Sequence, residues 1–361
     1  MSYFTTMNLP APSYDRFLEK FEHYRKKPTN AVSEFERELV KFFEVDAVST
    51  FTNCFTALSL ALLYATRKRP DTVAIAGLSY RRTTDIVLWA GLRPIYVDND
   101  PISLAMSLFH LEEKLATNDV GCVLLQHPMV NICDPFDYIS ICDNYGVPVV
   151  FDSVEATGAS YKNRKIGGFG ELEGFSLHPS KVINGAEGGV LTFGRIADYH
   201  KFLEYLHSIG VIDDNEKKQI FGLEPVHAIM GLASLEVYGD VRSQFNAHYL
   251  TYREKLMGSE SYRLVQYDMT TNPNFKSVLV ELRDTFPASR DALLQHLESH
   301  GIGARPYYAP LHRLAESEPL PVARRLSKLY FFLPIGHSVA TTDIEFICRE
   351  LLRFERQMLG G

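Results

Sequence analysis

The sequence predicts an α/β protein with two domains: a large one on a mainly parallel sheet flanked by helices, then a smaller C-terminal α+β domain. Three observations lead to this fold class. Charged amphipathic segments open the chain, short apolar runs alternate with helix-like stretches from about residue 46, and the alternation stops beyond about residue 240. We therefore expect residues 1–240 to form the large domain and 241–361 the small one.

The chain begins with two predicted helices between Tyr14 and Phe43. The segments SYDRFLEKFEHYRKK and SEFERELVKFF repeat apolar residues every three or four positions, with charged residues between them. This spacing is typical of amphipathic helices that bury one face.

The central part of the large domain alternates predicted strands with predicted helices. Segments such as TALSLALLYATRK and DYISICDNYG are helix-like and lie between apolar runs. Alternation of this kind indicates βαβ units and a mainly parallel sheet covered on both faces. The predicted strands are TVAIA (72–76), PIYV (94–97), CVLLQ (122–126), PVVF (148–151) and GGVLTF (188–193).

The C-terminal region changes character. FKSVLVEL (275–282) predicts a strand, ASRDALLQHLESHG a helix that ends at Gly301, and DIEFICRELLRFERQM a terminal amphipathic helix. A helix is expected over 227–250 and could belong to either domain. The smaller domain is therefore predicted to mix helices and strands.

Composition excludes several classes of function. Hydrophobic residues make up 46% and charged residues 22% of the 361, and the net charge of −7 gives no electrostatic basis for binding nucleic acid or an acidic membrane. We expect no signal peptide and no membrane span. The cysteines are odd in number and lack C-x-x-C spacing, so we expect reduced thiols in a cytoplasmic protein, without a disulfide frame or a metal site. They are Cys54, Cys122, Cys133, Cys142 and Cys348.

The first candidate site is an anion-binding turn. Small polar residues from Thr50 to Thr56 follow the apolar residues AVS and lead into the helix-like ALSLALLYA. The free N–H groups at the start of a helix, together with its dipole, bind phosphate. An ordinary N-cap by Thr52 or Asn53 is the alternative, and it is favoured when the turn is taken alone.

Two further candidates follow predicted strands. Asp152 comes directly after PVVF, at the edge of the sheet where ligands bind, and could hold a ring nitrogen protonated. Tyr80 follows TVAIA and could lie over a flat heterocycle. The alternatives are a helix-cap or turn aspartate and a half-buried loop tyrosine.

The fourth candidate is Lys181, which follows GFSLHPS and precedes a glycine-rich turn, GAEGG. A desolvated lysine has a lowered pKa, and its free amine can form an imine. The hydroxyl groups of Ser176 and Ser180 could donate hydrogen bonds to a phosphate. A solvated loop lysine is the alternative, and it is the commoner fate of lysines.

The order of these four features is more specific than any one of them. Turn, aromatic residue, aspartate and lysine each lie near a strand end of one βαβ series, and Asp152 precedes Lys181 by 29 residues. That order is the one a fold-type-I pyridoxal-phosphate site requires. The sequence therefore predicts a pyridoxal 5'-phosphate enzyme with Lys181 bonded to the cofactor.

Motifs across most of the chain resemble the DegT/DnrJ/EryC1/StrS family of sugar aminotransferases. The resemblance covers an N-terminal helix leading to the phosphate turn, the aromatic-bearing strand end, the aspartate-to-lysine segment and a C-terminal motif. The matching segments are AVSEFERELVKFFEVDAVSTFTNCFTALSLAL, GLSYRRTTDIVLWAGLRPIYVDND, FDSVEATGASYKNRKIGGFGELEGFSLHPSK, Glu187-Gly188-Gly189 and GIGARPYYAPLHR.

The resemblance implies a role for each position. Lys181 would form the imine and move the substrate proton, Asp152 would hold the pyridine nitrogen, and Tyr80 would stack on the ring. His178 would lie near the substrate as a further catalytic residue. The turn at Asn53, Cys54 and Phe55 would hold the phosphate together with the Ser176 hydroxyl, and Glu155 stands at a further cofactor-contacting position. Arg305 and His312 match C-terminal motif positions without an assigned duty.

The resemblance also implies the reaction. An amino group would move from glutamate or a similar donor to a keto-sugar, nucleotide-linked or phosphorylated, in the biosynthesis of amino sugars or of secondary metabolites such as antibiotics. A homodimer with a shared active site is expected. The alternatives are a cyclitol or other carbocyclic substrate, and a non-catalytic regulatory homologue. Dehydrating relatives carry histidine in place of the lysine, so Lys181 argues against dehydration.

Three positions depart from the family pattern. Glu155 replaces a glutamine or histidine that reaches the phenolic oxygen of the cofactor, where a carboxylate would repel a phenolate unless it were protonated. Cys54-Phe55 lacks one hydroxyl of the usual turn. IFGLEPVHA (220–228) lacks the asparagine and arginine of the segment that crosses the dimer, and Lys217 and Lys218 are candidate substitutes.

Overall fold

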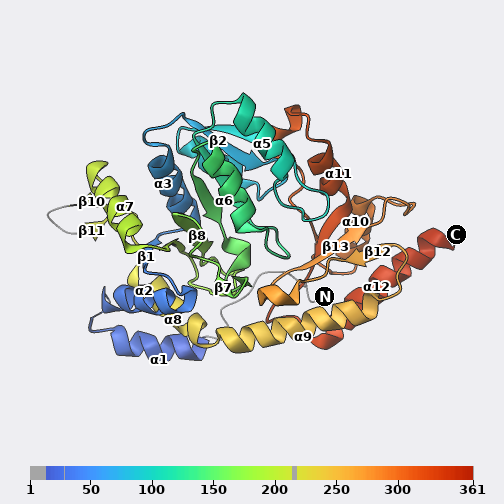
Figure 1. The fold of residues 1–361 in the computed structure, drawn as a ribbon. Helices are drawn as coiled ribbons and strands as arrows, with labels where there is room; N and C mark the ends of the chain where they lie inside the picture. Colours follow the sequence, from blue (N-terminus) through green and yellow to red (C-terminus); the bar gives the residue numbers. More distant parts are fainter. Residues whose placement is uncertain (1–13, 28, 214–217, 361) are drawn as a thin grey trace.

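Two sheets form the framework of the protein (Figure 1). The structure, a computed structural model, describes residues 14–27, 29–213 and 218–360. Within these residues the larger sheet has the strand order β1-β9-β8-β5-β4-β2-β3, and a second sheet has the order β12-β13-β15-β14. The predicted α/β class with a mainly parallel sheet is confirmed.

The larger sheet is parallel except at β9, which pairs antiparallel with both β1 and β8. The predicted runs at 72–76 and 122–126 are strands at those positions, and the others differ from the observed strands by one residue. The strands are β1 (Ala47–Phe51), β2 (Thr72–Ala76), β3 (Arg93–Val97), β4 (Cys122–Gln126), β5 (Val149–Asp152), β8 (Leu172–Ser176) and β9 (Gly189–Phe193).

Helices cover both faces of this sheet, which explains why its strands are apolar throughout. In β2, Val73 and Ile75 belong to the core cluster that includes α3 (Cys54–Thr66). Ala74 and Ala76 point to the other face and join a cluster with α5 (Leu108–Thr117) and α6 (Pro135–Asn144). The remaining helices of this part are α4 (Arg82–Trp89) and α7 (Ile196–Ser208).

The N-terminal helices α1 (Tyr14–Tyr24) and α2 (Thr29–Phe43) pack against α8 (Pro225–Glu236). The prediction of one helix over 227–250 is wrong, because α8 ends and α9 (Tyr238–Leu256) begins at Val237. Val237 has a ψ of 7°, outside the helical range, and a weak helix former, Gly239, follows two residues later. The break lets α9 run from α8 to β12 and α12 (Figure 1).

The second sheet is antiparallel and carries the remaining helices. The predicted strand from Phe275 begins only at Val278, because Phe275 has a φ of +57° and cannot continue an extended chain. The elements are β12 (Tyr262–Leu264), β13 (Val278–Leu282), α10 (Arg290–Ser299), β14 (Arg305–Pro306), α11 (Pro321–Leu329), β15 (Tyr330–Leu333) and α12 (Thr341–Leu359).

Short elements complete the fold. They are η2 (Val154–Ala156), β6 (Ser160–Tyr161), β7 (Arg164–Lys165), β10 (Ile212–Asp213), β11 (Lys218–Gln219), η3 (Met269–Thr271) and η4 (Ala315–Ser317). The two main sheets draw on residues 47–193 and 262–333, and the domain boundary at 240 stays a prediction. All five cysteines are free. No helix among the described residues has both the length and the apolar composition to cross a bilayer.

Candidate active site

A cavity of about 610 Å³ lies where strands β2, β4, β5 and β8 of the larger sheet end. Residues in or between the strands of the second sheet line its other side, among them Lys276, Arg305 and Tyr308. Every site residue expected from the sequence lines this cavity, and their individual roles stay predictions. They are Asn53, Cys54, Phe55, Tyr80, Asp152, Glu155, Ser176, His178 and Lys181.

The start of α3 forms the predicted anion-binding turn. Asn53 is the N-cap, and its Oδ1 accepts a hydrogen bond of 2.8 Å from the Thr56 N–H. The cap and the anion site coexist, because the N–H groups of Cys54 and Phe55 have no acceptor among the described residues. Two free donors at a positive helix terminus suit a phosphate.

Gly189 allows strand β9 to approach this turn. A Cβ built on Gly189 would lie 2.4 Å from the Asn53 carbonyl oxygen and 2.6 Å from the Cys54 nitrogen. Any other residue would push the turn away from the cavity. The glycine-rich return after Lys181 therefore shapes the turn on the neighbouring strand β1.

Asp152 ends β5 and is buried. Its Oδ2 accepts a hydrogen bond of 3.3 Å from the Gln126 side chain, and its Oδ1 accepts one of 3.3 Å from the Val154 N–H. Burial first, and the charge of Glu155 second, raise the pKa of Asp152 to about 7. A cation placed against this carboxyl would hold it ionised.

Gln126 also positions the expected aromatic residue. Its Oε1 accepts a hydrogen bond of 3.0 Å from the Tyr80 N–H, so one side chain ties Tyr80 to Asp152. The Tyr80 side chain is 53% exposed, and its ring centroid lies 6.3 Å from that of Tyr308. The ring is therefore at the mouth of the cavity, open to a flat ligand.

Glu155 is the centre of a buried charge cluster. Its Oε1 lies 2.8 Å from Lys181 Nζ, and its Oε2 lies 2.5 Å from Lys276 Nζ. Burial opposes the charge of Glu155, but the two lysines outweigh it and lower the pKa of the carboxyl to about 2. The carboxylate of Glu155, which the sequence predicts to repel a phenolate, is thus ionised, and the charges of the two lysines compensate its own.

Lys181 differs from expectation in one respect. We expected desolvation to lower its pKa, but the ion pair with Glu155 outweighs the effect of burial and raises the pKa of Lys181. The amine is therefore held as an ammonium, and its nucleophilic form requires the loss of a proton. Lys181 still lies in the cavity that was predicted for it.

The loop before Lys181 is held by hydrogen bonds between residues close in sequence. The Ser180 N–H donates to His178 Nδ1 at 3.2 Å, the Ser180 hydroxyl lies 2.9 Å from the same atom, and the Ser176 hydroxyl accepts from the His178 N–H at 3.3 Å. Burial lowers the pKa of His178, which favours the neutral ring. Ser176 and Ser180 both line the cavity.

Sequence reasoning missed three residues of the site: Lys276, Gln126 and Tyr308. Tyr308 is half-buried, and its buried hydroxyl has no hydrogen-bond partner among the described residues. Gln126 was visible as the polar end of the strand CVLLQ, whereas nothing near Lys276 in the sequence marks it as a site residue.

The other motif positions lie at the edge of the site or outside it. Arg305 lines the cavity, whereas His312 Nε2 lies 3.4 Å from Asp85 and does not line it. The segment 220–228 runs beside the end of β1, where the Thr52 N–H donates to the Phe221 carbonyl. Lys217 and the side chain of Lys218 lie outside the part of the chain that the structure describes.

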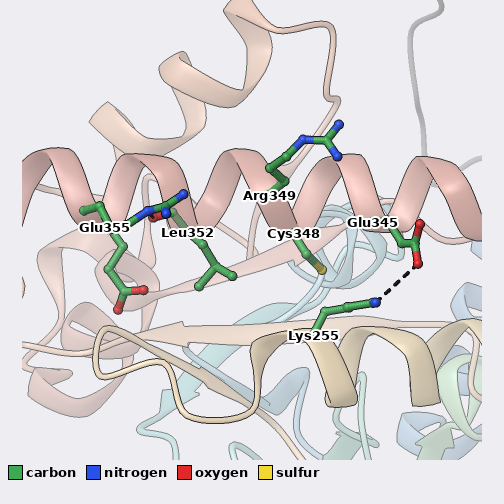
Figure 2. A pocket seen from close by; sticks show the side chains of 7 residues that line it. Lys255, Glu345, Cys348, Arg349, Leu352 and Glu355 are labelled. Carbon is green, nitrogen blue, oxygen red and sulfur yellow. Dashed lines mark hydrogen bonds and ion pairs between the residues drawn. The ribbon is translucent and has the colours of Figure 1, made fainter.

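A second hollow, between α9 and α12, holds no comparable chemistry (Figure 2). Lys255 and Glu345 form an ion pair of 3.3 Å there, and burial raises the pKa of the Cys348 thiol to about 12. Glu355 accepts hydrogen bonds from Ser259 and from the Ser261 N–H, which is a structural use. The reactive groups gather in the cavity at the strand ends.

The fold and this cavity define a pyridoxal-phosphate-dependent transferase. The chain belongs to the DegT/DnrJ/EryC1/StrS aminotransferase family, whose model matches residues 20–352. It is 25% identical to GDP-perosamine synthase of Escherichia coli O157:H7 over 334 residues, covering 90% of each chain. It is 26% identical to dTDP-4-amino-4,6-dideoxy-D-glucose transaminase of Shigella dysenteriae over 323 residues, covering 86% of this chain and 87% of the relative.

A solved structure has the same fold. Helicobacter pylori PseC, an aminotransferase involved in the biosynthesis of pseudoaminic acid, superposes with a TM-score of 0.83 at 18% identity, covering 99% of this chain and 100% of PseC.

The cofactor of the family, pyridoxal 5'-phosphate, fits the donor set of the cavity. Free N–H groups at Cys54 and Phe55 suit its phosphate, the weakly paired carboxyl of Asp152 suits a protonated ring nitrogen, and Lys181 supplies the amine. Each group lies near a different strand end, so the cavity offers separate contacts for three parts of one flat molecule.

Proposed function

We propose that this chain transfers an amino group from glutamate or a similar donor to a nucleotide-linked keto-sugar in amino-sugar biosynthesis. One observation carries the proposal. Lys181, the amine that the family requires, lies in the cavity together with Asp152 and the open N-terminal turn of α3. Named relatives make GDP-perosamine and a dTDP-linked amino sugar, which supports a nucleotide-linked acceptor.

The residues of this chain divide the work. The Cys54 and Phe55 N–H groups and the Ser176 hydroxyl hold a phosphate, Asp152 holds a ring nitrogen protonated, and Tyr80 covers the ring at the mouth of the cavity. The bound cofactor supplies an aldehyde and an electron-withdrawing ring. Lys181 would hold the cofactor through its Nζ, and the same amine would carry the proton at the amino-bearing carbon of the substrate.

Glu155 and His178 complete the proposed site. Glu155 holds the Lys181 ammonium through its Oε1 and sets the protonation state of that amine. His178 is neutral and fixed by Ser180, so it is placed to contact the substrate near Lys181. Both assignments concern residues that line the same cavity.

We also propose a homodimer that shares its active sites. Leu88 and Trp89 are large apolar side chains exposed at the end of α4, with Trp89 57% exposed. Trp89 contacts Phe55 of the phosphate turn, with ring centroids 5.8 Å apart. An exposed apolar patch beside a ligand site favours coverage by another subunit.

A cytoplasmic location, expected from the five reduced cysteines, belongs to the same proposal.

The test is a half-reaction. Native protein loaded with pyridoxal phosphate should show the visible absorbance of a lysine-bound cofactor and release 2-oxoglutarate from glutamate, and Lys181→Ala should abolish both. Lys255→Ala removes an ion-paired lysine in the remote hollow and should change neither. Native protein without the band, or a band that survives in Lys181→Ala, would sink the proposal.

The acceptor is identified by a screen. GDP- and dTDP-linked keto-sugars should accept the amino group, whereas keto-inositols should not. Transfer to a keto-inositol alone would favour the carbocyclic alternative. Failure of the half-reaction in protein that binds the cofactor would favour a regulatory homologue. If the sugar that accepts the amino group is one found in antibiotics, this would indicate a role in an antibiotic pathway.

A further inference from the structure

A second lysine enters the active site just ahead of strand β13 of the second sheet. Lys276 precedes β13, and its Nζ lies 2.5 Å from Glu155 Oε2, while Lys181 Nζ lies 2.8 Å from Oε1 of the same carboxylate. The side chains of Lys276, Glu155 and Lys181 are only 6%, 5% and 17% exposed. One buried carboxylate therefore joins two ammonium groups.

The backbone around Lys276 is fixed to the loop that carries Glu155. The Asn274 side-chain amide donates hydrogen bonds of 3.0 Å to the carbonyl oxygens of both Glu155 and Thr157. The Asn274 Oδ1 accepts from the Lys276 N–H at 3.1 Å. Phe275 between them holds a φ of +57°, an uncommon conformation for a bulky residue that packing must enforce. Lys276 is thus held at its backbone by Asn274 and at its ammonium group by Glu155.

The balance of charge around Glu155 changes when Lys181 reacts. An amine bonded to a cofactor no longer serves Glu155 as an ordinary ammonium partner. A buried carboxylate left alone is strongly destabilised, and it raises the pKa of any basic nitrogen beside it. Lys276 is the other cation in contact with Glu155 among the described residues.

We propose that Lys276 is a positioning residue that keeps Glu155 ionised and electrically balanced while Lys181 is bonded to the cofactor. The Glu155–Lys276 pair then presents a net neutral partner to the reacting nitrogen, which a lone carboxylate could not do. This inference rests on the proposed function, since it concerns the cofactor-loaded protein.

The pKa of Lys276 agrees with this role. Burial lowers it, Glu155 opposes that effect, and the charge of Lys181 lowers it further. Loss of the Lys181 charge would therefore raise the pKa of Lys276 and keep it an ammonium while Lys181 is bonded to the cofactor. Other ionisable groups that sense this cluster are the same residues in all the variants below. They are Cys54, Asp152, Tyr267, Tyr307 and Tyr308.

The test is the pH titration of the visible absorbance of the loaded protein. In Lys276→Met an uncompensated Glu155 should raise the midpoint by about one to three pH units, the effect of an unpaired opposite charge a few ångströms away. In Glu155→Gln the remaining Lys276 charge should lower the midpoint. The double variant, again neutral at this position, should titrate close to the native protein. Lys255→Met is the matched control and should not move the midpoint.

The outcomes separate the two proposals. Midpoints unchanged in both single variants, in protein that still shows the band, would overturn the role of Lys276 and leave the proposed function standing. If Lys276→Met fails to fold, the comparison of Glu155→Gln with the double variant decides. A double variant no nearer to native than Glu155→Gln would also overturn the role. Absence of the band from native protein would overturn the proposed function and this inference together.

Discussion

The first residue of β9 leaves no room for a side chain beside the phosphate turn, and this gives a sharp test of the site. In Gly189→Ala the new Cβ would lie 2.4 Å from the Asn53 carbonyl oxygen, 2.5 Å from its carbon and 2.6 Å from the Cys54 nitrogen. These are backbone atoms, which cannot rotate away. Ordinary contact begins at 3.4 Å, so β9 and the turn must separate by about 1 Å.

The displacement should affect binding more than folding. Gly189 pairs with Phe51 in β1 and with Ser176 in β8, so the shift is shared by three strands of a well-packed sheet. Overpacking of this kind costs about 1–3 kcal/mol of stability. The Asn53 carbonyl also accepts the first helical hydrogen bond of α3, so the two N–H groups beside it turn away from the phosphate. We expect the Kd for pyridoxal phosphate to rise by about tenfold or more, since 1.4 kcal/mol corresponds to a factor of ten.

The assay is an absorbance titration of cofactor-free protein with pyridoxal phosphate, accompanied by thermal unfolding. Gly239→Ala is the matched control, because a Cβ there meets nothing within 4 Å and the residue lies in α9. It should leave the Kd unchanged and raise the stability slightly, as alanine does in helices. Native affinity in a folded Gly189→Ala protein would refute the assignment of the phosphate to this turn.

Two further predictions concern a buried carboxyl and an exposed indole. Because the pKa of Asp152 in the folded protein is about 7 and its ordinary value is 3.8, ionisation opposes folding of the cofactor-free protein. Asp152→Asn should therefore stabilise the cofactor-free protein by an amount that grows from pH 4 to about pH 7 and then levels off. The rate of the glutamate half-reaction should fall. An equal effect on Tm at pH 4 and pH 8 would contradict the burial of this charge. Trp89→Glu should convert a dimer to a monomer in analytical ultracentrifugation, whereas Phe109→Glu, a still more exposed aromatic site at the start of α5, should not. A Trp89→Glu protein that remains a dimer would exclude this surface from the interface.

The strands of the larger sheet were predictable because burial on both faces makes each of them a continuous apolar run. TVAIA and CVLLQ were placed to the residue, and helices on both sides account for their composition. The break at Val237 was not predictable, since the segment on each side is helical by pattern. Only packing in three dimensions, with α8 on the N-terminal helices and α9 on α12, separates them.

The local half of the site was predictable for a similar reason. The N-cap turn, Asp152 and Lys181 each follow a strand, and the carboxyl ends of parallel strands meet at one edge. Lys276 and Tyr308 come from the segments around the second sheet. No local pattern marks Lys276, and Tyr308 lies in the motif GIGARPYYAPLHR, which does not show what this residue contacts. Their contribution depends on how that sheet is placed against the first, which no spacing along the chain encodes.

Glu155 shows how a residue distant in sequence, Lys276, changes the chemistry of the site residues that the sequence predicted. From the sequence alone, an ionised carboxylate at this position is unfavourable, because it would repel a phenolate and alter the electronic state of the cofactor. In the structure Lys276, 121 residues away, turns it into half of an ion pair. A neutral side chain and a buried ion pair are two solutions to one electrostatic requirement, no net charge beside the reacting nitrogen. The ion pair costs more free energy, since two charged groups must be desolvated. The loss of either group leaves the other as an uncompensated buried charge. It also makes the cofactor site depend on the segment that enters the second sheet, so any movement of Lys276 would change the charge felt at Lys181.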